Sequence, residues 1–244
     1  MLRLILVLFF LVIYLILSIP VFLIEWVIGK FSRKTRDYSS LRNVQCAFRF
    51  ILKVAGVKVT VIGEENIPDE PVLYIGNHRS FFDIPVTYSR CKRLTGFISK
   101  KEFESVPLLS TWMKYLYCLF LDRQDMKQSL KIILQAIDYV KQGISIFIFP
   151  EGTRNRGEEL SMLPFKEGAF KIAVKTGCAI VPVSINNTAS ILENHFPMIK
   201  KTHVIVEYGT PVYPKDLDPD TKKHLAVYFQ DIIQNTINKN ADLV

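Results

Sequence analysis

The stretch DMKQSLKIILQAIDYVKQGISIFIF, residues 125–149, joins a helix pattern directly to a strand pattern. Up to Gly143, apolar side chains recur three and four positions apart, with Asp125 as an N-cap and Gly143 just past the last turn. Residues 144–149, ISIFIF, form a short apolar run rich in isoleucine and phenylalanine, which is typical of a buried strand. A helix that leads into a buried strand indicates a parallel sheet with helices on its faces.

The same alternation continues along the chain. Further apolar runs that predict strands cover residues 57–62, 72–76, 94–99, 117–122, 179–185 and 203–209. Further helix patterns cover residues 164–177 and 220–240. A chain of 244 residues suits one such domain with a full core. We therefore predict an α/β fold in which helices flank a mostly parallel, mixed sheet.

Residues 4–24 carry no charged side chain. A helix of this length spans about 30 Å, which is enough to cross the hydrocarbon core of a bilayer. A cleaved signal peptide would need a small-x-small site, which is missing before Glu25, and a core helix is rarely apolar on every face. We expect a membrane-inserted helix, either crossing the bilayer or lying in one leaflet. With a second amphipathic helix after residue 48, it would form an anchor over residues 1–55, followed by an α/β domain over 56–244.

Basic residues are distributed unevenly around this apolar segment. Lys30, Arg33, Lys34 and Arg36 follow it, whereas only Arg3 precedes it. The positive-inside rule then places the rest of the chain on the cytoplasmic side of the membrane, for a bacterium the inner membrane.

The net charge of +8 has two interpretations: attraction to anionic lipid headgroups, or an ordinary solvated basic surface. No basic-aromatic pattern indicates nucleic acid as a partner. The four cysteines form no close pairs, which argues against disulfides and zinc, and no histidine or cysteine cluster suggests another metal.

The loop after residues 72–76 carries His78 and Asp83 within NHRSFFD, residues 77–83. In one interpretation His78 is a turn residue, and Asp83 either forms a capping box with Ser80 or is itself the N-cap of a helix with Pro85 in its first turn. In the other they form a dyad, in which a neutral imidazole removes a proton from an alcohol and a carboxylate fixes its tautomer. A loop that bends into a helix after His78 permits the dyad but does not demand it.

The loop after residues 144–149 begins with FPEGTR, residues 149–154. Gly152 lets backbone approach a ligand closely, and Arg154 offers a planar fork that matches phosphate oxygens. A surface turn with a Glu151–Arg154 ion pair is the alternative.

Lys100, Lys101 and Arg123 also follow strand patterns. Together with Arg154 they suggest an anion site, provided that the strands lie side by side. The chain lacks a G-x-S-x-G nucleophile elbow, a Walker loop and a G-x-G-x-x-G motif, and Cys118 falls inside an apolar strand. Direct attack by a base-activated hydroxyl fits these residues better than a covalent acyl-enzyme.

Four blocks, in order, resemble the glycerolipid acyltransferases. NHRSFFD matches their N-H-x-x-x-x-D block and FPEGTR their E-G-T-R block. FISKKEF to LFLDR, residues 97–123, is similar to the block between them, and AIVPVSI, residues 179–185, is similar to the fourth. The order and the basic helical anchor are most similar to 1-acyl-sn-glycerol-3-phosphate acyltransferases of bacterial type. Asn155 stands where many members carry serine.

The resemblance implies transfer of a fatty acyl group from acyl carrier protein or coenzyme A to the sn-2 hydroxyl of lysophosphatidic acid, which gives phosphatidic acid. It implies no cofactor and no metal. His78 would be the general base and Asp83 its orienting partner. The substrate-binding residues would be Arg154 and Lys100 on the phosphate, Arg123 as a weaker contact, and Glu151, Gly152 and Thr153 in the E-G-T-R turn. Glycerol 3-phosphate or another lysolipid is an alternative acceptor, and a non-catalytic lipid-binding protein at the membrane surface is an alternative class.

Overall fold

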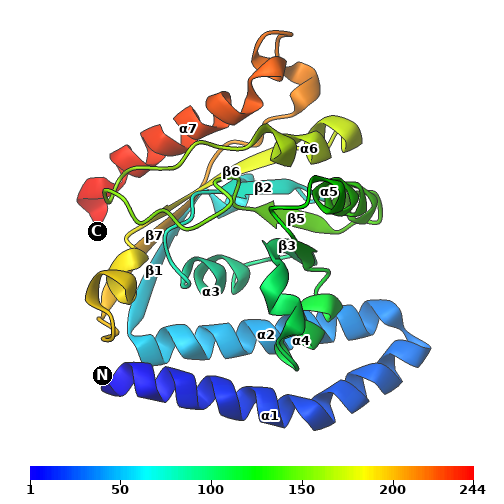
Figure 1. The fold of residues 1–244 in the computed structure, drawn as a ribbon, viewed down its shortest axis with the longest axis vertical. Coiled ribbons are helices and arrows are strands. Elements are labelled where there is room, and N and C mark those ends of the chain that lie inside the picture. Colours follow the sequence, from blue (N-terminus) through cyan, green and yellow to red (C-terminus); the bar gives the residue numbers. More distant parts are fainter.

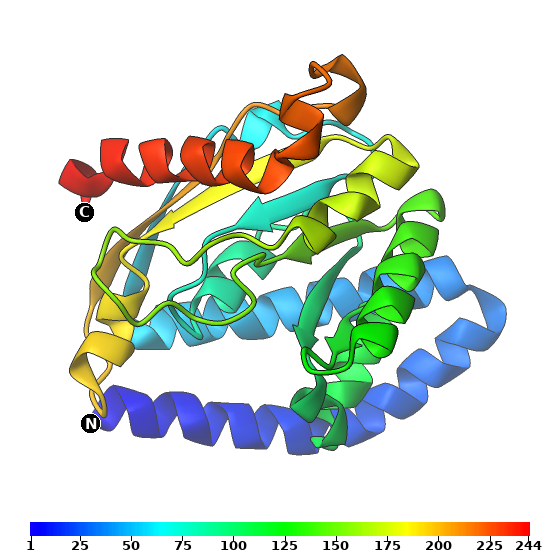
Figure 2. The same ribbon diagram turned by 45° about the horizontal axis from the view of Figure 1, so that its top comes forward.

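The computed structural model describes residues 1–244. Its centre is a seven-stranded mixed sheet in the order β1-β7-β6-β2-β5-β3-β4, with helices on both faces (Figures 1 and 2). All neighbouring strands are parallel except β6 and β7. The strands are β1 (Val57–Ile62), β2 (Leu73–Gly76), β3 (Thr95–Lys100), β4 (Leu119–Leu121), β5 (Ser145–Ile148), β6 (Ile180–Asn186) and β7 (Thr202–Tyr208). The predicted fold class is confirmed.

Seven α-helices surround the sheet: α1 (Leu2–Phe31), α2 (Arg33–Ala55), α3 (Asp83–Tyr88), α4 (Leu109–Tyr115), α5 (Met126–Lys141), α6 (Lys171–Thr176) and α7 (Leu225–Lys239). Helix α5 begins as predicted, since the Asp125 side chain accepts hydrogen bonds from the backbone of Lys127 and Gln128. The helix predicted over residues 164–177 is wrong at its start. Backbone N–H of Lys166 donates to the carbonyl of Pro150, and only a 3₁₀ turn (Glu167–Phe170) and α6 follow.

Both faces of the sheet are covered, and each builds its own hydrophobic core. Leu73 and Ile75 of β2 face the core that contains α5, α6 and α7, whereas Tyr74 faces the core that contains α2 and α3. Every residue of β2 and β5 is buried. Burial on both faces explains why these strands read as continuous apolar runs in the sequence.

Helix α2 belongs to the same core as the sheet. Its Leu41, Val44 and Leu52 are buried there, and the Gln45 side chain donates to the carbonyls of Tyr88 and Cys91. The second helix expected after residue 48 is thus much longer, because the Ser32 side chain caps a helix start far upstream. Its charged outer face hides this start in the sequence.

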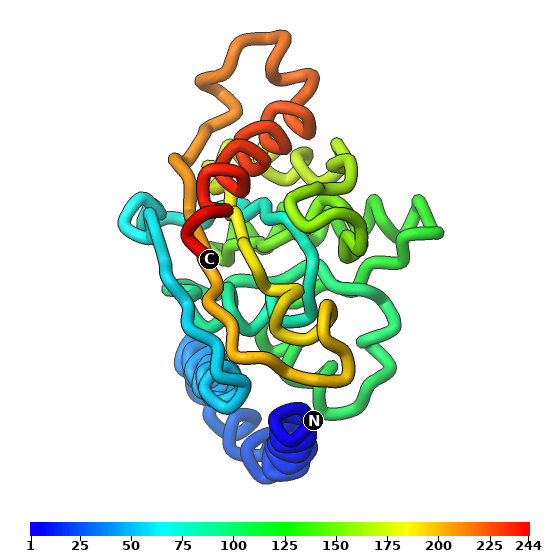
Figure 3. Tube along the Cα trace, turned by 90° about the vertical axis from the view of Figure 1, so that its left-hand side faces the viewer, coloured from blue at the N-terminus to red at the C-terminus, as the bar shows by residue number.

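Helix α1 runs antiparallel to α2 along the base of the molecule (Figures 1 and 3). It is the one helix that is long and apolar enough to cross a membrane. One face packs on the protein: the Tyr14 hydroxyl donates to Asn43, and the Trp112 indole donates to Ser18. The opposite face exposes large apolar side chains along the whole helix, among them Leu2, Ile5, Phe9, Val12, Ile16, Leu17, Leu23 and Phe31.

Candidate active site

The polar loops predicted to carry the chemistry meet at the carboxyl-terminal ends of the central strands. Strands β6, β2 and β5 are neighbours and parallel, so their carboxyl ends lie together, where ligands gather in such sheets. Asn77 holds the loop after β2 to the end of β6. Its amide donates to the carbonyl of Ile185 (2.9 Å) and accepts from the Ile185 N–H (2.8 Å). His78 therefore starts from a fixed backbone position.

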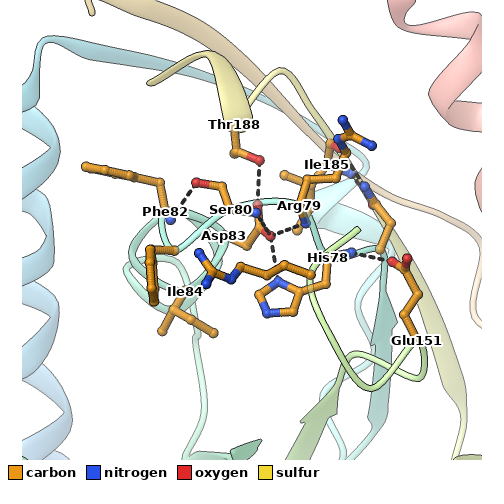
Figure 4. Close-up of polar contacts among 12 residues, drawn as sticks. His78, Arg79, Ser80, Phe82, Asp83, Ile84, Glu151, Ile185 and Thr188 are labelled. Atoms are coloured by element: carbon orange, nitrogen blue, oxygen red, sulfur yellow. Dashed lines mark hydrogen bonds and ion pairs between the residues drawn. The ribbon is translucent and has the colours of Figure 1, made fainter. Parts of the chain in front are cut away.

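The structure brings His78 and Asp83 together (Figure 4). Imidazole Nδ1 lies 2.7 Å from Oδ2 of Asp83, which is fully buried at the start of α3. The same oxygen accepts from the backbone N–H groups of Arg79 and Ser80, both at 2.8 Å. Because a carboxylate accepts only, Nδ1 donates, and Nε2 keeps the free lone pair. Asp83 thus ties down the bend that leads into α3 and orients the imidazole.

Two further residues, missed in the sequence, complete this pair. The buried Thr188, in the loop after β6, donates its hydroxyl to the second oxygen of Asp83. The ring of Phe149 stacks on the imidazole, with 4.2 Å between centroids and 17° between planes. Contacts on both sides hold the ring, and 17% of the His78 side chain is exposed. Thr188 lies in no motif and Phe149 only precedes the E-G-T-R block, so only the fold shows that they contact the pair.

Glu151 joins the two loops through backbone contacts. Its buried carboxylate accepts from the N–H of His78 (2.6 Å) and from the N–H of Leu163 (2.8 Å). Burial raises the pKa of this carboxyl despite both hydrogen bonds. Asn155 adds a second link, since its N–H donates to the carbonyl of His78 at 2.8 Å. The two loops therefore form one rigid unit.

Arg154 does not pair with Glu151, so the ion pair weighed from the sequence is wrong. Its Nη1 lies 3.2 Å from Glu193, and its guanidinium lies 3.6 Å from the ring centroid of Phe81. Glu193 also accepts from the Ser80 hydroxyl (2.7 Å) and the Phe81 N–H (2.8 Å). A cavity of about 450 Å³ opens here, lined among others by Arg79, Phe81, Arg154, Arg156, Glu193 and Phe196.

The remaining predicted residues lie around this centre. Gly152 takes a φ of +76°, a conformation that favours glycine, and Thr153 is exposed. Lys100 ends β3 and Arg123 lies just after β4, and both line a separate cavity of about 650 Å³. Lys100 is paired there with Glu102. The predicted cations are thus divided between cavities and do not all surround one point.

Two other kinds of site, a cysteine nucleophile and a metal centre, find little support among the side chains. Cys118 is partly buried against the core, and desolvation raises the pKa of its thiol to about 11, which keeps it protonated at neutral pH. The structure contains no group of three histidine, cysteine or acidic side chains that could hold a metal ion.

A sequence model described as acyltransferase matches residues 58–186, just over half of the chain, and this stretch includes both loops of the site. The chain belongs to the acyltransferase family. A protein of Haemophilus influenzae named 1-acyl-sn-glycerol-3-phosphate acyltransferase is 31% identical over 75% of this acyltransferase and 75% of the relative. Its namesake in Saccharomyces cerevisiae is 29% identical over 81% of this chain.

The chain spans less than two thirds of several curated relatives that it matches, namely 65% of the yeast protein and 48% of one from Chlamydomonas reinhardtii. A crystal structure from Thermotoga maritima, titled as the 1-acyl-sn-glycerophosphate acyltransferase PlsC, superposes with a TM-score of 0.79. It covers 97% of this acyltransferase and 96% of its own chain at 24% identity, and it therefore shares the fold.

Proposed function

We propose that this acyltransferase moves a fatty acyl group from the thioester of acyl carrier protein or coenzyme A to the sn-2 hydroxyl of 1-acyl-sn-glycerol 3-phosphate, which gives phosphatidic acid. The names of its relatives support this acceptor. The observation that carries the proposal is the imidazole of His78. Its Nδ1 is held at 2.7 Å by a buried carboxylate, and Nε2 is left as a free base in the site.

The reaction follows from this arrangement. Nε2 of His78 takes the proton of the acceptor hydroxyl while its oxygen attacks the thioester carbonyl. A carbon–oxygen bond forms, the carbon–sulfur bond breaks, and the departing thiolate receives the proton from the imidazolium. Asp83 stabilises the imidazolium between these steps, as a carboxylate does in a catalytic triad. No covalent acyl-enzyme and no cofactor is needed.

Arg154 binds the phosphate of the acceptor. Its planar guanidinium suits two phosphate oxygens, and the contacts with Phe81 and Glu193 hold it in place before the lipid arrives. Glu151 and Gly152 shape the turn that delivers it, with Thr153 exposed beside them. Lys100 and Arg123 contact a charged part of a substrate in their own cavity.

Residues 1–55 form the membrane-binding part, in which α2 also packs in the core of the catalytic domain, and residues 56–244 form the rest of that domain. The exposed face of α1 supports this division, because its apolar side chains run the length of the helix without covering. The other face of α1 packs on α2 and α4, which supports a position of the domain against the lipid surface. Lys30 at the end of α1 and Arg33 and Lys34 at the start of α2 favour the cytoplasmic surface of the cell membrane.

An acceptor and donor panel on the purified protein in detergent tests this function. Phosphatidic acid should form from lysophosphatidic acid with at least one of the two thioester donors. Acylation of glycerol 3-phosphate with no turnover of lysophosphatidic acid would replace the proposed acceptor. No acyl transfer with any pair would contradict the enzymatic role.

A further inference from the structure

A small cavity next to the E-G-T-R turn contains two cations that form no direct ion pair. Its volume is about 190 Å³, and Lys166 and Arg123 both line it. Neither side chain makes a hydrogen bond or an ion pair. The other lining residues are mostly apolar or small: Ile98, Ser99, Leu121, Ser129, Ile133 and Ile148. A cavity that holds unpaired positive charge fits an anionic group.

Lys166 is held against the turn at its backbone. Its N–H donates to the carbonyl of Pro150 at 3.1 Å, which fixes the residue beside the end of β5. A Cβ atom on Gly152 would lie only 2.8 Å from Nζ of Lys166, so the ammonium group rests directly on this glycine. The missing side chain at Gly152 is what makes room for the ammonium group.

Arg123 approaches the same cavity from the end of β4. Its neighbours are already paired, since Lys101 contacts Asp122 (3.0 Å) and Lys100 contacts Glu102. Partial desolvation lowers the pKa of Arg123, although the residue as a whole is exposed. Its guanidinium therefore keeps its donors available for a ligand.

The cavity connects to the reacting centre through Phe149. This ring lines the cavity and stacks on the imidazole of His78. Arg154 does not line it and lies instead with Glu193 in the 450 Å³ cavity. The site thus offers two separate places for phosphate, one on each side of the E-G-T-R turn. The acceptor carries only one phosphate. Apart from the acceptor phosphate, the one phosphate that both proposed donors have in common is on the phosphopantetheine arm of acyl carrier protein and coenzyme A.

We propose that Lys166 and Arg123 form a second phosphate subsite, which binds the phosphate of the donor's phosphopantetheine arm and leaves Arg154 for the acceptor. The apolar wall suits the alkyl and amide part of the arm. The adjoining 650 Å³ cavity, which shares Leu121 and Arg123, offers space for the carrier beyond the phosphate. This assignment rests on the proposed function, because it takes the donor to be a phosphopantetheine thioester.

Direct binding tests the subsite without turnover. The full-length protein in detergent is titrated with 4′-phosphopantetheine and with pantetheine, which differ only in the phosphate. The wild type should bind the phosphorylated compound roughly tenfold more tightly or better, as expected for charge-assisted hydrogen bonds. Lys166→Ala should abolish this preference, Lys166→Arg should keep it, and Lys171→Ala, an exposed unpaired lysine outside the cavity, should behave as wild type. Equal binding of both compounds to the wild type, or an unchanged preference in Lys166→Ala, would overturn the subsite.

Kinetics show whether the phosphate bound at Lys166 belongs to the acyl donor or to the acceptor. Lys166→Ala should raise KM for the acyl donor roughly tenfold and leave KM for lysophosphatidic acid unchanged, and Arg154→Ala should do the reverse. A rise in the acceptor KM alone in Lys166→Ala would overturn the donor assignment. If the protein transfers no acyl group at all, the proposed function fails, while the binding experiment still gives its own answer on the subsite.

Discussion

Asp83→Asn removes the charge beside His78 while leaving the hydrogen bonds in place. Three donors converge on Oδ2 of Asp83: Nδ1 of His78 and the backbone N–H groups of Arg79 and Ser80. The other oxygen contacts the hydroxyl of Thr188, which can rotate to accept. An asparagine therefore points its carbonyl oxygen toward His78 and its NH₂ group toward Thr188. The imidazole then keeps its tautomer, with the free lone pair on Nε2.

The expected loss is the stabilisation of the imidazolium by charge. A hydrogen bond to a charged group is stronger than a neutral one by about 1 to 2 kcal/mol, and the buried position of Asp83 puts the loss near the upper end or slightly above it. About 2 to 3 kcal/mol corresponds to a decrease in kcat of roughly 30- to 160-fold. Phosphatidic acid formation at saturating substrates gives kcat, and thermal unfolding checks the fold.

Two results would refute this reasoning. A kcat within twofold of wild type would show that the Asp83 charge does not act on the reaction. A loss as large as that of His78→Ala would show that the asparagine amide points its NH₂ group at His78, which reverses the imidazole tautomer. The backbone N–H groups of Arg79 and Ser80 should prevent this orientation. Asp83→Ala serves as the comparison, because it removes both charge and orientation and should be clearly worse than Asp83→Asn.

Three other changes test neighbouring parts of the site and the anchor. Glu193→Gln should raise KM for the acceptor roughly fivefold with little change in donor KM, because Arg154 loses its charged partner; equal changes in both would argue for a general structural role. Glu151→Gln should lower the free energy of unfolding by about 1 to 3 kcal/mol, since the amide cannot accept from two backbone N–H groups. Because burial raises the pKa of Glu151, the folded state holds this proton more tightly, so its contribution to stability falls as pH rises above about 4.5; denaturant titrations of wild type and variant should show this slope in the wild type alone. Phe9→Ser with Leu17→Ser, on the exposed face of α1, should reduce vesicle binding at least tenfold without changing the melting temperature, and unchanged binding would argue against insertion of this face.

The sequence predicts the sheet well because its strands are apolar runs, and the central strands β2, β5 and β6 are buried along their whole length. Apolar runs bounded by turn residues then mark every strand, and β1 matches its predicted range of residues 57–62 to the residue. The sequence also allows the His78–Asp83 contact to be predicted, because both residues lie on one short loop next to a strand end. The second helix was predicted too short because charged residues on the outer face of α2 separate its buried residues along the sequence. The start of the helix therefore does not stand out as an apolar pattern.

Long-range partners have no local signal. Glu193 lies after β6 and Arg154 after β5, far apart in sequence, and only the strand order β6-β2-β5 brings them together. The Glu151–Arg154 ion pair, weighed as the alternative, does not form: spacing within a turn suggests it, whereas the buried carboxylate accepts from backbone N–H groups. Lys166 fell within a helix pattern, and the hydrogen bond to Pro150 that extends the chain there depends on tertiary structure.

The central claim is that His78 is the base of an acyl transfer to lysophosphatidic acid. Its most direct test is the rate of phosphatidic acid formation by wild type, His78→Ala and His224→Ala, an exposed histidine at the start of α7, with both thioester donors. We predict product from wild type and His224→Ala, and a decrease in kcat of roughly a hundredfold to ten-thousandfold for His78→Ala with the fold intact. A folded His78→Ala that turns over at the wild-type rate would contradict the account.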